Sequence, residues 1–367
     1  MENLGLASHN LFGGAYKGRR IVLTGHTGFK GSWLALWLTR MGAEVTGIAL
    51  PPETQPSHWD LLGLKIHEFI IDMRDSAQVS RAVRDARPDL VIHMAAQSLV
   101  RRSYRVPADT WGTNIMGTVN VLEACRDLEN LKGVLIITSD KVYANKESTN
   151  GYIEEDTLGG HDPYSASKAA TELLVKSYRS SFFNRPGAAL LATARAGNVI
   201  GGGDWAEDRL IADAVRARMT GEDVVIRNPG AVRPWQHVLE PLSAYLMLGQ
   251  GMLSGKTNYA SAWNVGPESK NSLRVSDVLD RMKHYWPDLG WNIVPDHALH
   301  ETAALYLDST KIKAALKWTS VMTIDEHIHM TAEWYRAFIE KNEILSEQQL
   351  LRYCLFAQDR KAPWVST

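Results

Sequence analysis

Two short segments of the sequence carry side chains that could transfer protons. Tyr164 and Lys168 lie four residues apart, so both side chains share one face if this stretch is a helix. A tyrosine has an ordinary pKa of about 10 and is a poor base at neutral pH. A neighbouring lysine cation favours the phenolate and lowers that pKa, which would let Tyr164 accept a proton.

The second segment, Ser139-Asp140-Lys141, offers a hydroxyl, a carboxyl and an amine in succession. It follows an apolar run, VLIIT at 134–138, which is typical of a strand buried on both faces. Ligands of open α/β sheets bind at the carboxyl ends of such strands. Each side chain alone could be a capped loop or a surface ion pair. Together with the Tyr–Lys pair, the three are expected to face a binding crevice.

A glycine-rich loop, GHTGFKG, lies between a short strand at 19–24 and a helical stretch at 32–41. Glycines in such a loop permit a tight turn and let the backbone approach a pyrophosphate, while the helix N-terminus supplies amides and partial positive charge. We therefore expect a dinucleotide site here. The loop residues expected to bind the dinucleotide are Gly25, Thr27, Gly28, Phe29, Lys30 and Gly31.

The second strand ends in Ile48-Ala49-Leu50-Pro51. An acidic residue at this point usually holds the adenosine ribose of NAD, and an arginine accommodates the 2′-phosphate of NADP. Neither is present, so this position does not distinguish the two cofactors. Asp72, at the end of the third strand, could instead contact the adenine edge.

Short apolar strands alternate with helical stretches over the first two hundred residues. Strands are expected at 19–24, 44–49, 67–71, 90–94 and 134–138, and helices at 32–41, 79–86 (opened by Asp75 with Gln78) and 109–128. This alternation predicts an α/β fold with a Rossmann-type doubly wound parallel sheet and a smaller C-terminal substrate-binding lobe. We assign 15–200 to the dinucleotide-binding domain, with 231–262 returning to it, and 201–230 and 263–340 to the smaller lobe.

The overall composition excludes several classes of protein. Forty basic residues against forty-one acidic ones give a net charge of −1, which argues against a nucleic-acid surface or a polybasic membrane patch. The two cysteines, Cys125 and Cys354, have no metal-ligand spacing, so we expect a reducing compartment, no disulfide and no metal. No signal peptide or membrane-spanning run is visible, and a cytoplasmic protein is expected.

Longer motifs resemble those of the nucleotide-sugar 4,6-dehydratases, in the extended short-chain dehydrogenase/reductase family. They occur in order between about residues 17 and 318: GHTGFKGSWL, HMAAQSLVR, TNIMGTVNVLEA, ITSDKVY, YSASK, RAGNVIGGGDW and RPWQHVLEPL. Most of these dehydratases carry Asp-Glu where this chain has Asp140-Lys141, and Asp-Lys is the form of the CDP-glucose branch. The resemblance implies NAD as cofactor and CDP-glucose as substrate, converted to CDP-4-dehydro-6-deoxyglucose and water.

The resemblance also implies a role for each reactive group. Tyr164, aided by Lys168 and Ser139, would take the proton of the sugar 4-hydroxyl while hydride leaves C4 for NAD. Lys141 would remove the C5 proton and Asp140 would protonate the departing 6-hydroxyl. Hydride would then return to C6 and a proton to C5. Lys141 would then need a lowered pKa and Asp140 a raised one. If the two merely pair as ions, neither is in its working state in the resting enzyme.

Further contacts and an assembly follow from the same resemblance. Besides the loop, Tyr164 and Lys168, the residues expected at the cofactor are Asp72, Met73, Ala95, Ala96 and Asn114. Those expected at the nucleotide-sugar are Gln97, Arg101, Asn198, Arg209, Arg233 and His300. The helices at 109–128 and 164–182 are the usual dimer surfaces of the family, so we expect a homodimer or a larger homo-oligomer.

Other functions stay open. Another 4,6-dehydratase is possible because no residue physically distinguishes cytosine from thymine, so CDP rests on the resemblance. A nucleotide-sugar 4-epimerase shares the fold, the loop and the Tyr–Lys pair, but needs no acid–base pair at C5 and C6, which Asp140-Lys141 would supply. A non-catalytic NAD-binding regulator could have lost Tyr164 or Lys168, and this chain keeps both.

Overall fold

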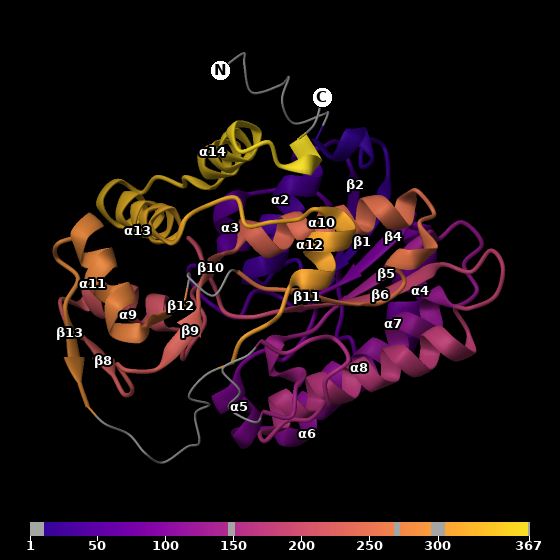
Figure 1. The fold of residues 1–367 in the computed structure, drawn as a ribbon, viewed down its shortest axis with the longest axis horizontal. Coiled ribbons are helices and arrows are strands. Elements are labelled where there is room, and N and C mark those ends of the chain that lie inside the picture. The colour runs from indigo at the N-terminus through magenta and orange to yellow at the C-terminus, as the bar shows by residue number, and fades with distance from the viewer. Residues whose placement is uncertain (1–10, 146–150, 268–271, 295–304, 366–367) are drawn as a thin grey trace.

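A parallel sheet of seven strands forms the centre of the protein (Figure 1). The computed structural model describes residues 11–145, 151–267, 272–294 and 305–365. In spatial order the strands are β11 (Ala262–Val265), β6 (Leu190–Ala196), β5 (Gly133–Ile137), β4 (Leu90–His93), β1 (Arg20–Thr24), β2 (Glu44–Ala49) and β3 (His67–Ile70). All neighbours are parallel, and the order reverses between β1 and β4. This confirms the expected doubly wound α/β fold.

Helices cover both faces of the sheet because the strand side chains alternate between them. In β1, Val22 packs into one apolar cluster while Ile21 and Leu23 pack into the other. Helices α4 (Ser76–Ala86), α7 (Gly117–Cys125) and α8 (Pro163–Ser181) cover the first face, and α2 (Phe29–Arg40) and α10 (Leu239–Leu253) cover the second. The central strands β4 and β5 are buried at every residue because helices cover both of their faces, whereas the edge strand β3 is largely exposed.

The strands expected in the first half match the observed ones within a residue or two. Asp75 also caps α4, since its carboxylate accepts the Gln78 amide at 3.0 Å. The single helix expected at 109–128 is instead α6 (Pro107–Trp111), a π-helical turn η3 (Gly112–Met116) and α7, which ends at Cys125. A single π-helical turn, with hydrogen bonds from i to i+5, interrupts the α-helical register within this stretch.

A smaller lobe lies at one end of the sheet, on the left in Figure 1. It contains α9 (Leu210–Thr220), β8 (Val224–Ile226), β9 (Val232–Pro234), β12 (Ser272–Arg274), α11 (Val275–Tyr285) and β13 (Trp291–Ile293). Strand β8 pairs with β13 in parallel, and β9 pairs with β12 antiparallel. Between these lobe segments the chain returns to the sheet through α10 and β11. The domain limits given above remain a prediction.

The C-terminal region packs on the α2 side of the sheet through α13 (Ile324–Lys341) and α14 (Ser346–Asp359). The N-terminal turn η2 (Leu11–Gly14) meets the C-terminal turn η7 (Pro363–Val365), and the Phe12 ring stacks on Trp364 with 5.1 Å between centroids. Both cysteines are buried free thiols. Within the described ranges no helix is long and apolar enough to span a bilayer. The cytoplasmic location remains a prediction.

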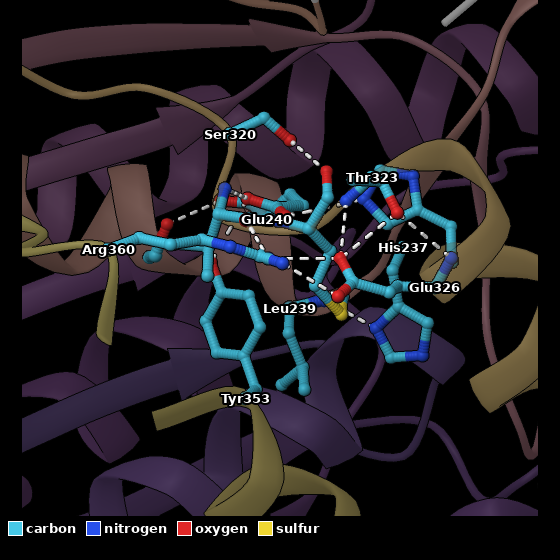
Figure 2. Close-up of polar contacts among 12 residues, drawn as sticks. His237, Leu239, Glu240, Ser320, Thr323, Glu326, Tyr353 and Arg360 are labelled. Atoms are coloured by element: carbon cyan, nitrogen blue, oxygen red, sulfur yellow. Dashed lines mark hydrogen bonds and ion pairs between the residues drawn. The ribbon is translucent and has the colours of Figure 1, made fainter. Parts of the chain in front are cut away.

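A buried carboxylate ties this C-terminal region to α10 (Figure 2). Glu240 is fully buried and accepts the backbone amides of Val321 at 2.9 Å and Met322 at 2.7 Å. The Tyr353 hydroxyl donates to it at 3.1 Å, and His327 Nε2 lies 3.3 Å away. Because a buried carboxylate is stable only with such partners, Glu240 fixes the entry to α13 and the middle of α14 on the sheet.

Candidate active site

The carboxyl ends of strands β1 to β6 open into one cavity of about 620 Å³, closed on its far side by the smaller lobe. That volume lies in the range of small-molecule and cofactor sites. Most of the residues expected from the sequence line it: Gly25, Thr27, Gly28, Phe29, Lys30, Gly31, Asp72, Met73, Ala95, Ala96, Gln97, Arg101, Ser139, Asp140, Lys141, Tyr164, Lys168, Asn198, Arg209 and Arg233. The fold therefore gathers residues that are far apart in the chain.

One expected residue, Asn114, is not among the described residues that line the cavity. Asn114 is buried behind the wall, where its Oδ1 accepts the Gln97 amide at 2.9 Å and its Nδ2 donates to the Gln97 carbonyl at 3.1 Å and to Ser167 Oγ at 2.8 Å. Asn114 therefore holds the Gln97 segment against α8, and its direct contact with the cofactor stays a prediction. His300, expected at the nucleotide-sugar, lies outside the described residues.

The glycine loop forms a tight cradle at the start of α2. Gly25 has φ +74°, and a Cβ there would lie 2.7 Å from the Ala95 nitrogen. A Cβ at Gly31 would lie 2.0 Å from the Gly25 carbonyl oxygen, so only glycine fits this close approach. No side chain caps the helix at Gly28. The first-turn amides of α2 thus fit the pyrophosphate of a dinucleotide.

The apolar tip of β2 and the end of β3 line the same cavity as the glycine loop. Thr27 Oγ1 donates to the Leu50 carbonyl at 2.9 Å, which joins the glycine loop to that tip. The Asp72 carboxylate binds Arg74 Nη2 at 2.6 Å, and this hydrogen bond lowers the pKa of Asp72. Asp72 is thus a carboxylate at neutral pH, already engaged by an arginine that also reaches Asp109.

Tyr164 and Lys168 come from the first two turns of α8. Asp162 caps this helix by accepting the Ser165 amide at 2.9 Å. Lys168 is buried, and its Nζ donates to the Ile137 carbonyl at 3.2 Å. Burial and then the positive charge of Lys30 lower the pKa of Lys168 to about 8.

The pKa of Tyr164 moves against the expectation from the sequence. Burial raises the pKa of this phenol, and a hydrogen bond with Ser139 and the positive charge of Arg209 oppose that rise. In this structure the cost of burying a phenolate outweighs the neighbouring positive charges. The prediction that Lys168 lowers the pKa of Tyr164 is therefore wrong for this structure, in which burial decides the direction of the shift.

The three groups after β5 line the cavity from the short turn η4 (Asp140–Val142) and the residue just before it. Ser139 Oγ donates to Asp140 Oδ1 at 3.0 Å and accepts the Lys141 amide at 3.2 Å. Lys141 Nζ lies 3.9 Å from Asp140 Oδ1, at the long end of an ion pair. Gly197 leaves room for this carboxylate, since a Cβ there would lie 2.9 Å from Asp140 Oδ2.

A buried ion pair beneath this group was missed in the sequence. Glu172 lies one helical turn after Lys168 and binds Arg195 Nη2 at 2.8 Å, with both side chains 3% exposed. Its carboxylate also accepts Thr138 Oγ1 at 2.5 Å and Thr193 Oγ1 at 2.8 Å. The negative charge of Glu172 opposes the lowering of the Lys168 pKa. The sequence could have indicated this ion pair, because Glu172 follows Lys168 by four residues and therefore lies on the same helix face.

Arginines gather at the lobe side of the cavity. Arg209 and Arg233 line it as expected, and Arg227, missed in the sequence, lines it as well. Arg227 Nη2 lies 3.2 Å from Asp208 Oδ1, and Arg101 Nε lies 3.9 Å from the same atom. Guanidinium groups bind two phosphate oxygens at once, so this end suits a diphosphate.

The sequence of the chain matches one family over most of its length. A profile of the GDP-mannose 4,6 dehydratase family covers residues 22–331, so the chain belongs to this family. A CDP-glucose 4,6-dehydratase from Salmonella typhimurium is 43% identical over 337 residues, which cover 90% of this chain and 94% of that one. A probable dTDP-glucose 4,6-dehydratase from Sinorhizobium fredii is 28% identical over 338 residues, covering 86% and 92%.

Solved structures share the fold. A dTDP-glucose 4,6-dehydratase from Streptomyces venezuelae, solved with NAD bound, superposes with a TM-score of 0.73 at 22% identity, covering 86% of this chain and 97% of that one. A UDP-glucose 4-epimerase from Thermus thermophilus, in complex with NAD, gives a TM-score of 0.74 at 24% identity, covering 86% and 99%. Dehydratases and epimerases therefore share this architecture, and the fold alone does not separate them.

Proposed function

We propose that the protein converts CDP-glucose to CDP-4-dehydro-6-deoxyglucose and water, with NAD regenerated in each turnover. The observation that carries the proposal is the group of side chains around the end of β5. Oxidation at C4 needs a base, and loss of water across C5 and C6 needs a second base and an acid. Tyr164, Lys141 and Asp140 would supply these three functions, and all three line one cavity. The relative of 43% identity supports the nucleotide and the sugar.

In the proposed mechanism Tyr164 accepts the proton of the 4-hydroxyl, and the Lys168 ammonium stabilises the phenolate. NAD bound at the glycine loop would supply the reversible hydride transfer, from C4 and later back to C6. The 4-ketone makes the C5 proton acidic, and Lys141 removes it. Asp140 protonates the 6-hydroxyl, which leaves as water. Lys141 then returns its proton to C5 when C6 receives the hydride, and the proton that Tyr164 took from the 4-hydroxyl balances the one that Asp140 gave up. The arginines at the lobe side, with Asn198, would hold the diphosphate and the sugar.

The test follows product mass. The purified protein is incubated with NAD and, separately, with CDP-, dTDP-, UDP- and GDP-glucose. Loss of one water from CDP-glucose, without net NADH, is expected. Water loss from another nucleotide-sugar would keep the mechanism and overturn the substrate. Epimerisation without water loss would overturn the dehydratase, and Lys141→Met should abolish water loss while leaving some C4 oxidation.

We also propose that the protein is a homodimer through α8 and the neighbouring α6–η3–α7 segment. These elements pack against each other and expose apolar side chains, with Leu173 56%, Met116 52% and Trp111 39% exposed. Exposed apolar side chains gathered on one face mark an interaction surface. Light scattering should give twice the chain mass for the wild type and the chain mass for Leu173→Glu. A monomeric wild type would contradict the assembly.

A further inference from the structure

A line of buried hydrogen bonds connects the C-terminal helices to the first turn of α2. Trp334 Nε1, on α13, lies 2.9 Å from Ser346 Oγ, the first residue of α14. Ser346 Oγ lies 2.8 Å from Nε2 of His58, which opens the short helix α3 (His58–Leu62). His58 Nδ1 lies 2.7 Å from Ser32 Oγ. Ser32 Oγ then donates to the Phe29 carbonyl at 2.9 Å, within the glycine-loop turn.

The chemistry of its members gives this line one direction. Ser32 Oγ donates its one proton to the Phe29 carbonyl at 2.9 Å, and with that proton in place it accepts from His58 Nδ1–H. Burial lowers the pKa of His58 to about 3, so the ring is neutral and its Nε2 is bare. Nε2 therefore accepts the Ser346 hydroxyl. The Trp334 indole can only donate, and it donates to Ser346 Oγ.

Packing prevents the His58 ring from turning out of this line. The ring is 2% exposed and stacks on Trp33 with 4.9 Å between centroids. Gly203 also lies against the side chain, where a Cβ would come within 2.4 Å of the ring. Trp33 Nε1 also donates to the Gly202 carbonyl at 2.9 Å. His58 is thus wedged between α2 and the Gly201–Gly203 turn.

We propose that His58 is a positioning residue for the cofactor loop, fixing the first turn of α2 on α13 and α14. The inference rests on the proposed function, because it concerns NAD affinity. Of the described residues in α13 and α14, none lines the cavity. These helices hold Ser346 in place, partly through the Glu240 contacts. His58 connects Ser346 to Ser32, and Ser32 binds the loop carbonyl of Phe29. The position of Ser346 therefore affects the amides that would receive the pyrophosphate.

The experiment is calorimetric titration of NAD into the full-length, NAD-free protein. Ser346→Ala breaks the far end of the line and Ser32→Ala the near end. Each should raise the Kd of NAD about three- to tenfold, the range expected for loss of a buried hydrogen bond. The double variant should bind NAD no more weakly than the single variant with the higher Kd, because both changes interrupt the same line of hydrogen bonds. At saturating NAD, kcat should stay within about twofold for Ser346→Ala, so the effect falls on cofactor affinity.

Gln349→Ala is the matched control. Gln349 Nε2 donates to the Met330 carbonyl at 2.7 Å, so this change removes a buried bond between the same two helices without touching the line to α2. Its Kd for NAD should equal that of the wild type. Ser346→Thr and Ser346→Val differ only in the hydroxyl, and Thr should bind NAD more tightly than Val if the line matters.

Each outcome bears on one of the two claims. Unchanged affinity in Ser346→Ala, or factors that multiply in the double variant, would overturn the role of His58. Equal weakening by Gln349→Ala would reduce the effect to general loosening of the helices and also overturn it. If Ser346→Ala does not fold, equal affinities of the Thr and Val variants would do the same. A wild type that binds no NAD would overturn the proposed function as well.

Discussion

Two carboxylates are buried on opposite faces of the sheet, and their surroundings differ. Glu172, on α8, is balanced by the Arg195 guanidinium and two threonine hydroxyls. One of those threonines, Thr138, lines the cavity, and so does Lys168 one turn away. Glu240, on α10, is held by two backbone amides, Tyr353 and His327, and none of these four partners lines the cavity.

The comparison shows that burial of a charge does not by itself indicate function. Both side chains are satisfied, as any buried carboxylate must be. The location of the partners distinguishes the two carboxylates, because only Glu172 lies close enough to a reactive group, Lys168, to act on the pKa of that group. We therefore expect Glu240 to contribute to stability and, through the position of Ser346, to cofactor affinity, but not to kcat. Glu172 should contribute to catalysis.

The largest effect should come from Glu240→Ala. Removing one member of a buried charged cluster costs about 3–5 kcal/mol, here by leaving two amides and His327 without their acceptor. Urea unfolding should show this loss, while kcat measured well below the unfolding transition stays unchanged. A loss of kcat in the folded variant would mean that the C-terminal helices act on the reactive groups too.

The free energy of unfolding should also depend on pH through Lys168, which lies one helical turn from Glu172. Its folded pKa of about 8 lies below the unfolded value of 10.5, so between these values the folded protein binds fewer protons. The free energy of unfolding therefore rises with pH across this window, by about 2–3 kcal/mol in total. The difference between wild type and Lys168→Met, measured by urea unfolding from pH 7 to 10.5, should show this rise. A flat difference would contradict the lowered pKa.

Glu172→Gln should lower kcat about tenfold, or about 1.4 kcal/mol, since the amide cannot neutralise Arg195 or favour the Lys168 ammonium. Losing its charge lowers the pKa of Lys168 further, so the alkaline limb of the kcat profile should move to lower pH. Glu240→Gln makes the same chemical change at the other carboxylate. It should leave the profile in place, and a shift of equal size there would remove the distinction.

The smallest effect is expected from Tyr353→Phe. The hydroxyl supplies one of several donors to Glu240, so its loss should cost about 1 kcal/mol in unfolding free energy. Thermal unfolding would measure this, with kcat unchanged. A cost as large as that of Glu240→Ala would show that the tyrosine, and not the backbone amides, is the main partner of the carboxylate.

Much of the first half of the fold could be predicted because its signals are local. The apolar runs at 20–24, 44–49 and 90–93 form strands wherever the sheet buries them, and the glycine loop needs its residue types in sequence. The groups after β5 could be located because strand ends in a parallel sheet share one edge. Lys168 and Glu172 share a face for equally local reasons.

The remaining features depend on contacts between distant segments. His58 and Ser346 are separated by 288 positions, and nothing near either residue indicates the other. The short helix α3 has too few residues for a periodic signal. The direction of the Tyr164 pKa shift depends on how deeply the fold buries the phenol, which no spacing of residues reveals.

The late return of the chain to the sheet has a consequence for synthesis. Strand β6 ends at Ala196, and its outer neighbour β11 begins only at Ala262. Chains emerge from the ribosome N-terminus first at about 5–20 residues per second, so β6 remains an open edge for several seconds after it has been made. An unpaired parallel edge can recruit strands from other chains. Aggregation during expression should therefore depend on the interval between these two strands more than on the stability of the finished protein.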